Sequence, residues 1–126
     1  MDRVKYNLEF IFRASPTIVY NFLTTPACLV RWFCDEVDIT PKGEYSFFWE
    51  GAEENAVVLE SEEGSFIQFE WEDAEEGEFL EFRMTRSPVT GETILIITDF
   101  ADDDEVEDAK QLWEKQISIL RSEMGG

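Results

Sequence analysis

Asp99 is the acidic residue whose position in the sequence best suits acid–base chemistry. The chain carries 29 Asp and Glu residues, so many carboxylate pairs can be imagined, but only one inside a cavity would matter. Asp99 stands at the end of the otherwise apolar segment 93–100 and could face inward. Burial would raise the pKa of its carboxyl group and make it a usable acid. A carboxylate in solvent, or one that caps a turn, is the favoured interpretation, because buried Asp is rare.

The chain has no histidine and only two cysteines, Cys28 and Cys34. The missing histidine removes the commonest general base, the usual partner of Ser and Cys nucleophiles, and the commonest metal ligand. Two thiols alone cannot build a structural zinc site, and there is no Cys-x-x-Cys motif. A disulfide is possible in principle, but free thiols in a reducing cytoplasm are favoured because no secretory signal precedes the domain. We therefore expect no metal, no cofactor and a cytoplasmic location.

The remaining charged candidates have simpler interpretations. Arg31 and Arg83 could clamp a ligand carboxylate, although surface salt bridges are favoured because so many acids are nearby. The acidic run 102–105 precedes an amphipathic segment and lacks the spacing and closing residues of a calcium loop. We expect it to lie at a helix N-terminus, where the helix dipole favours negative charge.

Composition limits the partners of the chain. Its 126 residues fit one domain, residues 1–126, and 44% of them are hydrophobic, enough for a sizeable core. The net charge of −19 disfavours nucleic acids and anionic membranes, because both bind through Lys and Arg. No segment is long and apolar enough for membrane insertion. A basic protein partner is compatible with this charge.

Period-two alternation predicts a strand over residues 4–12 and further strands over 35–40, 44–50, 55–62, 65–72 and 79–86. We interpret residues 51–54 as a polar turn. Segment 93–100 is apolar on both parities, so we expect a strand that is central or covered on both faces.

Two helix starts stand in tandem at Ser15-Pro16 and Thr25-Pro26, each a hydroxyl N-cap followed by proline. They predict a helix to about Leu23 and a second short helix. A terminal helix is expected over residues 105–124. Its apolar stripe consists of Val106, Ala109, Leu112, Trp113, Gln116, Ile117, Leu120 and Met124.

These elements carry a family resemblance. The chain resembles the START-like, Bet v-like superfamily in the pattern Ala14-Ser15-Pro16-x-x-Val19-Tyr20-x-x-Leu23-Thr24-x-Pro26, then Leu29-x-Arg31-Trp32-Phe33. Thr98-Asp99-Phe100 followed by acidic residues, with Trp113 entering the last helix, is similar to the branch of the C-terminal domain of the activator of the heat-shock-90 ATPase. The resemblance implies an α+β helix-grip fold, in which six or seven antiparallel strands wrap the terminal helix and two short helices close one end. It also implies a cavity for lipids, sterols, polyketides or aromatic compounds.

Strand parity and helix phase predict the residues that line this cavity. Ligand cavities are mostly apolar with a few orienting polar groups, and Gln116 interrupts the apolar stripe as such a group. The alternative is an ordinary packed core. The candidate ligand-binding residues are Phe22, Trp32, Phe33, Tyr45, Phe47, Trp49, Ile67, Phe69, Trp71, Leu80, Phe82, Met84, Trp113, Gln116, Ile117 and Leu120.

The sequence favours non-catalytic binding of a small hydrophobic or aromatic ligand. A chaperone-activator-like protein-interaction module is the first alternative, and a cyclase- or hydrolase-like enzyme is the second. Outward parity of Ile11, Phe48, Phe66 and Phe79 leaves a homodimer open, since grouped apolar residues would mark an interaction patch.

Overall fold

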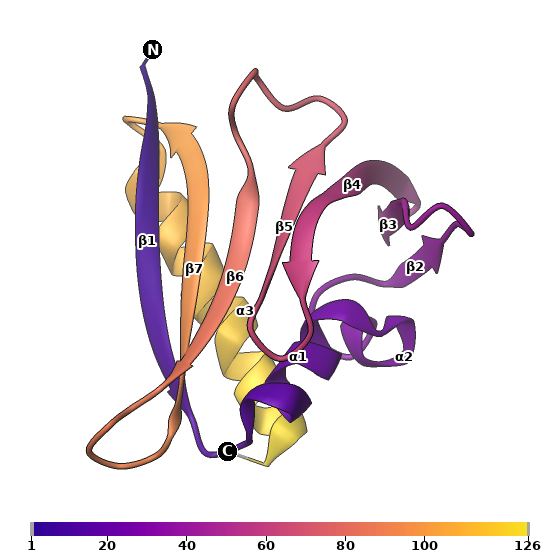
Figure 1. Ribbon diagram of the computed structural model, residues 1–126. Coiled ribbons are helices and arrows are strands. Elements are labelled where there is room, and N and C mark those ends of the chain that lie inside the picture. Colours follow the sequence, from indigo (N-terminus) through magenta and orange to yellow (C-terminus); the bar gives the residue numbers. More distant parts are fainter. Residues whose placement is uncertain (1, 126) are drawn as a thin grey trace.

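The computed structural model of the protein describes residues 2–125. Seven strands and three helices lie along them (Figure 1). In chain order they are β1 (Arg3–Phe12), α1 (Pro16–Thr24), α2 (Pro26–Leu29), β2 (Glu36–Ile39), β3 (Tyr45–Trp49), β4 (Ala52–Glu62), β5 (Phe66–Trp71), β6 (Leu80–Arg86), β7 (Thr93–Asp102) and α3 (Val106–Met124). The predicted order of elements and the helix-grip α+β fold are confirmed.

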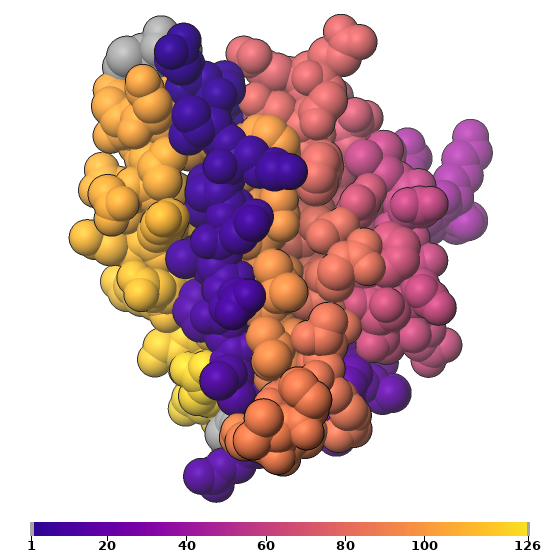
Figure 2. Space-filling view, turned by 60° about the vertical axis from the view of Figure 1, so that its left-hand side comes forward, coloured from indigo at the N-terminus to yellow at the C-terminus, as the bar shows by residue number. Residues whose placement is uncertain are grey.

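All seven strands form one antiparallel sheet in the order β1-β7-β6-β5-β4-β3-β2. The last strand therefore pairs with the first, and Tyr6 stands opposite Asp99 in this ladder. Helix α3 packs on the inner face of the sheet, in contact with β1 and β7. Figure 2 shows β1, in indigo, running between yellow α3 and orange β7. In the described residues no helix is both long and apolar enough to cross a bilayer.

The two helix starts use different caps. The Ser15 hydroxyl accepts a hydrogen bond from the backbone N–H of Ile18 at 3.3 Å, as its N-cap position predicts. The Thr25 side chain makes no capping bond, so that part of the prediction is wrong. The Thr25 backbone N–H donates to the carbonyl of Asn21, and its carbonyl accepts from Cys28 and Leu29. Thr25 is thus both the C-cap residue of α1 and the N-cap residue of α2.

The hairpin between β3 and β4 is tighter than the sequence indicates. Residues 51–54 are predicted as a turn, but β4 begins at Ala52, which pairs with Trp49. Glu50 and Gly51 alone form the loop, with φ of 49° and 85°. A two-residue loop with both φ values positive matches the twist of the flanking strands. The acidic residues Glu53 and Glu54 therefore belong to the strand rather than to the turn.

Strand β7 is covered on one face. Its inward residues Leu95 and Ile97 are fully buried, whereas the outward Ile94 and Ile96 are only half-buried. Strand β7 nevertheless lies inside the sheet, paired with β1 on one side and with β6 on the other. The expected central position is therefore confirmed, and only the alternative, cover on both faces, is not found. Leu112 is predicted in the apolar stripe of α3, but its side chain is 58% exposed, so that part of the prediction is wrong.

Candidate functional site

The predicted cavity residues lie together on the inner face of the sheet, on α3, on α1 and in the turn that follows α2. All sixteen are buried except Trp49, Trp71 and Gln116, which are half-buried. Their aromatic rings contact one another, for example Phe33 with Phe47 at 5.2 Å and Phe82 with Trp113 at 5.8 Å between ring centroids. Parity and helix phase thus identified one continuous apolar interior.

These side chains nearly fill the interior that they line. The void between them has a volume of about 10 Å³, roughly the space of a single water molecule. Its walls are Leu23, Leu29, Phe33, Phe47, Phe69, Trp71, Leu80 and Phe82. A larger guest needs a side chain of this wall to move.

Trp71 differs from the other three tryptophans in how it is held. The indole N–H of Trp32 donates to the Phe22 carbonyl at 2.8 Å, that of Trp49 to the Phe33 carbonyl at 2.7 Å, and that of Trp113 to Asp99 at 3.2 Å. Trp71 makes no such bond to any described residue. Its ring is held by aromatic contacts, with Phe47 at 5.5 Å and Trp49 at 6.3 Å.

Trp71 also borders a cleft at the point where the sheet divides. Pairing of β5 with β6 ends at Phe69 and Leu80, and the chain from 72 to 79 then arches away from the sheet (Figure 1). Strand β7 continues beyond this point to Asp102. The result is a cleft of about 390 Å³, which we call the slot, lined by Arg3, Trp71, Asp73, Ala74, Glu75, Glu78, Phe79, Asp99 and Phe100.

Asp99 lies at this slot and faces the inner side of the sheet, so the favoured interpretation of a carboxylate in solvent is wrong. Its Oδ2 accepts hydrogen bonds from the Tyr6 hydroxyl at 3.3 Å and from the indole N–H of Trp113 at 3.2 Å, while Oδ1 accepts from the Phe100 backbone at 2.9 Å. Burial raises the pKa of Asp99, and the three hydrogen bonds oppose this shift. Burial also raises the pKa of Tyr6, and the nearby Asp99 charge adds to that rise.

An ion pair holds the outer rim of the slot. Arg3 donates two hydrogen bonds to Glu78, at 2.9 and 2.7 Å, and a third to Asp102 at 3.3 Å. This bidentate contact connects the segment 72–79 to the first residue of β1. The hydrogen bonds from Arg3 lower the pKa of Glu78, so Glu78 is ionised at neutral pH.

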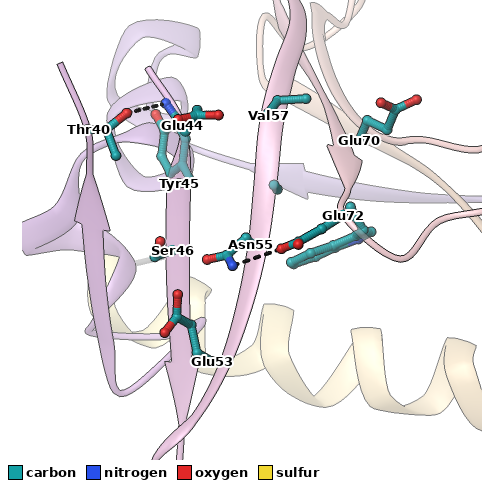
Figure 3. A pocket seen from close by; sticks show the side chains of 11 residues that line it. Thr40, Glu44, Tyr45, Ser46, Glu53, Asn55, Val57, Glu70 and Glu72 are labelled. Atoms are coloured by element: carbon teal, nitrogen blue, oxygen red, sulfur yellow. Dashed lines mark hydrogen bonds between the residues drawn. The ribbon is translucent and has the colours of Figure 1, made fainter. Parts of the chain in front are cut away.

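Further clefts lie on other parts of the surface. One, of about 470 Å³, is on the outer face of β3, β4 and β5, where Figure 3 shows Glu44, Glu53, Glu70 and Glu72 around Asn55. The Asn55 side-chain amide donates to Glu72 at 2.9 Å, and its buried Oδ1 has no hydrogen-bond partner among the described residues. Tyr45, Ala56 and Trp71 also line this cleft, so it shares Trp71 with the slot and with the central void. A cleft of about 660 Å³ lies between α1 and the β2–β3 hairpin and shares no residue with the central void.

The other charged candidates have structural roles. Arg31 pairs with Glu123 at 2.8 Å and Arg83 with Glu81 at 3.3 Å, so the surface salt bridges expected for both arginines are confirmed. The acidic run does precede α3, but Asp102 is the last residue of β7. Glu105 precedes α3 without a side-chain cap, and its pKa is raised by Asp102.

Both cysteines are free thiols. Cys34 is 6% exposed, and burial raises the pKa of its thiol to about 11. Such a thiol is protonated at neutral pH and therefore a poor nucleophile.

The outward apolar residues do not gather at one place. Ile11 is 55% exposed on the edge strand β1, whereas Phe48 lies on β3 near the opposite edge of the sheet. The Arg83 guanidinium lies 4.3 Å from the centre of the Phe66 ring. Phe79 packs against Phe100 at 5.4 Å.

Sequence reasoning missed three parts of the site. Tyr6 has the inward parity of its strand, a signal that could have placed it beside Asp99. Leu23 and Leu29 line the central void, and each lies on the apolar face that helical spacing predicts. The contact between Arg3 and Glu78 joins residues 75 positions apart, and no local pattern indicates it.

The comparisons with known proteins agree with this architecture. A family description, the START-like superfamily domain, matches residues 1–126. A Bacteroides fragilis protein solved by NMR is 32% identical, with a TM-score of 0.69 over 98% of this chain and 93% of its own. No protein of curated function matches the sequence significantly.

More distant structures share the fold alone. The Aha1 dimer of Colwellia psychrerythraea is 18% identical, with a TM-score of 0.76 over 94% of this chain and 93% of its own. A Staphylococcus saprophyticus protein is 15% identical, with a TM-score of 0.79 over 97% of this chain and 92% of its own. The whole-chain family match and the 32% identical relative establish that the protein belongs to the START-like superfamily.

Proposed function

We propose that this domain binds a small hydrophobic or aromatic molecule, without chemical turnover, between the sheet and α3. The interior there is lined by aromatic rings, and the superfamily is typically ligand-binding. The observation that carries the proposal is Trp71, the wall residue that is shared by the central void and the slot and that lacks an indole hydrogen bond to any described residue.

The guest enters when the Trp71 ring swings outward through the slot. The ring is half-buried, and aromatic pairs of the kind that hold it are worth about 0.5–1.5 kcal/mol each. Swinging out therefore breaks no hydrogen bond that the described residues make. The other indoles would each lose such a bond on moving, which makes them fixed parts of the wall.

Binding is favoured over catalysis by the surroundings of Asp99. An acid–base pair at Asp99 would need a second group nearby whose pKa lies near neutral pH. The side chains that contact Asp99 are Tyr6 and Trp113, which are hydrogen-bond donors. Because the Tyr6 pKa is raised further, Tyr6 does not serve as a base at neutral pH.

The test is an NMR titration of the isotope-labelled protein with three neutral probes: cholesterol, a monoacylglycerol and naphthalen-2-ylmethanol. We expect saturable amide shifts from residues 113–120 and from β5 to β7 with at least one probe. Trp71→Ala removes the ring that closes the interior. It should tighten that binding by about tenfold, because the open conformation that admits the probe is then always populated.

Phe48→Ala is the matched control. Phe48 is also a half-buried aromatic residue of the sheet, but it lies on the outer face of β3 and lines neither the central void nor the slot. It should leave the probe affinity within about twofold, well below the change expected for the gating residue. No saturable shift in either the native protein or Trp71→Ala would refute the proposal and direct the search to protein partners.

A further inference from the structure

Asp99 is an inward carboxylate whose hydrogen-bond donors are all neutral, and Arg3 acts on its pKa only from beyond salt-bridge distance. Its three hydrogen bonds come from a phenol, an indole and a peptide N–H, all of them neutral donors. Among the described residues, no Lys or Arg nitrogen lies within 4.0 Å of Asp99. A carboxylate has about four acceptor positions, so one stays free for another donor. A partly desolvated charge without a counter-charge is unfavourable, and a cationic guest would relieve this.

The other charges at the slot have the same sign. Asp73, Glu75 and Glu78 line it together with Asp99, and Arg3 is the one cation among its described lining residues. Arg3 is already shared between Glu78 and Asp102. The field at the slot is therefore negative, and it opposes the entry of carboxylates, phosphates and sulfates.

Aromatic rings complete the surroundings. Phe79 and Phe100 line the slot beside these carboxylates, and Trp71, the ring that moves to admit the guest, borders it. Ammonium groups are attracted to aromatic faces as well as to carboxylates. Carboxylate and aromatic groups at the mouth of an apolar interior suit a molecule with an apolar body and a cationic end.

We propose that the ligand is an amine, with its ammonium group hydrogen-bonded to Asp99 at the slot and its apolar body between the sheet and α3. This inference rests on the proposed function and names the ligand class. It assigns Asp99 a specificity-determining role and excludes fatty acids and other anionic lipids as ligands.

The experiment uses three probes with one aromatic body: 2-naphthylmethylamine, naphthalen-2-ylmethanol and 2-naphthoic acid. Affinities are measured by NMR titration at neutral pH in high salt, which screens the overall charge of the protein. We expect the amine to bind about tenfold tighter than the alcohol, since a charge-assisted hydrogen bond exceeds a neutral one. The acid should not bind measurably.

Substitutions separate Asp99 from the general field. Asp99→Asn should weaken amine binding by about tenfold and leave the alcohol unchanged. Asp99→Glu keeps the charge and should retain the amine preference, which keeps the test valid if Asp99→Asn folds poorly. Asp73→Asn removes one charge from the rim of the slot and serves as the matched control, with an expected change below about twofold.

Each outcome has a separate meaning. Equal affinity for the amine and the alcohol in the native protein overturns the assignment of an amine but leaves the proposed function standing. Equal losses in Asp99→Asn and Asp73→Asn overturn the role of Asp99, because only the long-range field would then act. Failure of all three probes to bind, in native protein and in Trp71→Ala, overturns the proposed function and this inference with it.

Discussion

Trp113 provides the sharpest test of how α3 is held against the sheet. Its side chain is 7% exposed, stacks on Phe33 at 6.2 Å and meets Phe82 edge-on at 5.8 Å. Its indole N–H donates to Asp99 at 3.2 Å. Packing and hydrogen bonding therefore both contribute, and two substitutions can separate them.

We expect Trp113→Ala to lower the free energy of unfolding by about 3–5 kcal/mol, the range for deleting a buried large aromatic side chain. Trp113→Phe keeps a ring in the cavity but removes the indole donor. It should lower the free energy of unfolding by about 1–2 kcal/mol, because Asp99 keeps its bonds from Tyr6 and Phe100. The difference between the two variants measures the packing alone.

The assay is urea unfolding followed by far-UV circular dichroism, since the substitutions remove a fluorophore. The denaturant dependence should stay constant, so that midpoint shifts report stability. Leu112→Ala, at the neighbouring position that is 58% exposed, should change the stability by less than about 0.5 kcal/mol. A loss below about 1 kcal/mol for Trp113→Ala would refute the packing of α3 described above.

Three further predictions concern single sites. Asp99 has a folded-state pKa above its unfolded value, so its stabilising contribution is present at low pH and is lost as pH rises through the folded pKa. Native protein should therefore lose stability relative to Asp99→Asn as the pH rises above about 4, and a constant difference in urea titrations would contradict this. Glu50→Asn should stabilise by about 0.5–1 kcal/mol in urea unfolding, because Asn tolerates the φ of 49° in the tight loop; a loss of stability would contradict that loop. With Ellman's reagent at neutral pH, the half-buried Cys28 should react in the folded protein and the buried Cys34 only on unfolding; equal rates would contradict their burial.

The sequence by itself determined the elements and the inner face. Alternation in the strands and the stripe of α3 follow from local geometry, since a strand repeats every two residues and a helix every 3.6. Sixteen interior residues could therefore be placed on one side without coordinates. Asp99 was also identifiable, because a carboxylate at the end of an apolar strand stands out in its local pattern.

The tertiary structure decided whether that interior is open. The volume left between packed side chains depends on how rings from five elements meet, and no local pattern carries this information. The slot likewise exists because β5 and β6 stop pairing at Phe69 and Leu80 while β7 continues to Asp102. The contacts of Asp99 with Tyr6 and Trp113, and of Arg3 with Glu78, join distant parts of the chain. Only folding brings such pairs within hydrogen-bond distance. These hydrogen bonds then fix the side chains that make them, whereas a side chain without one can move.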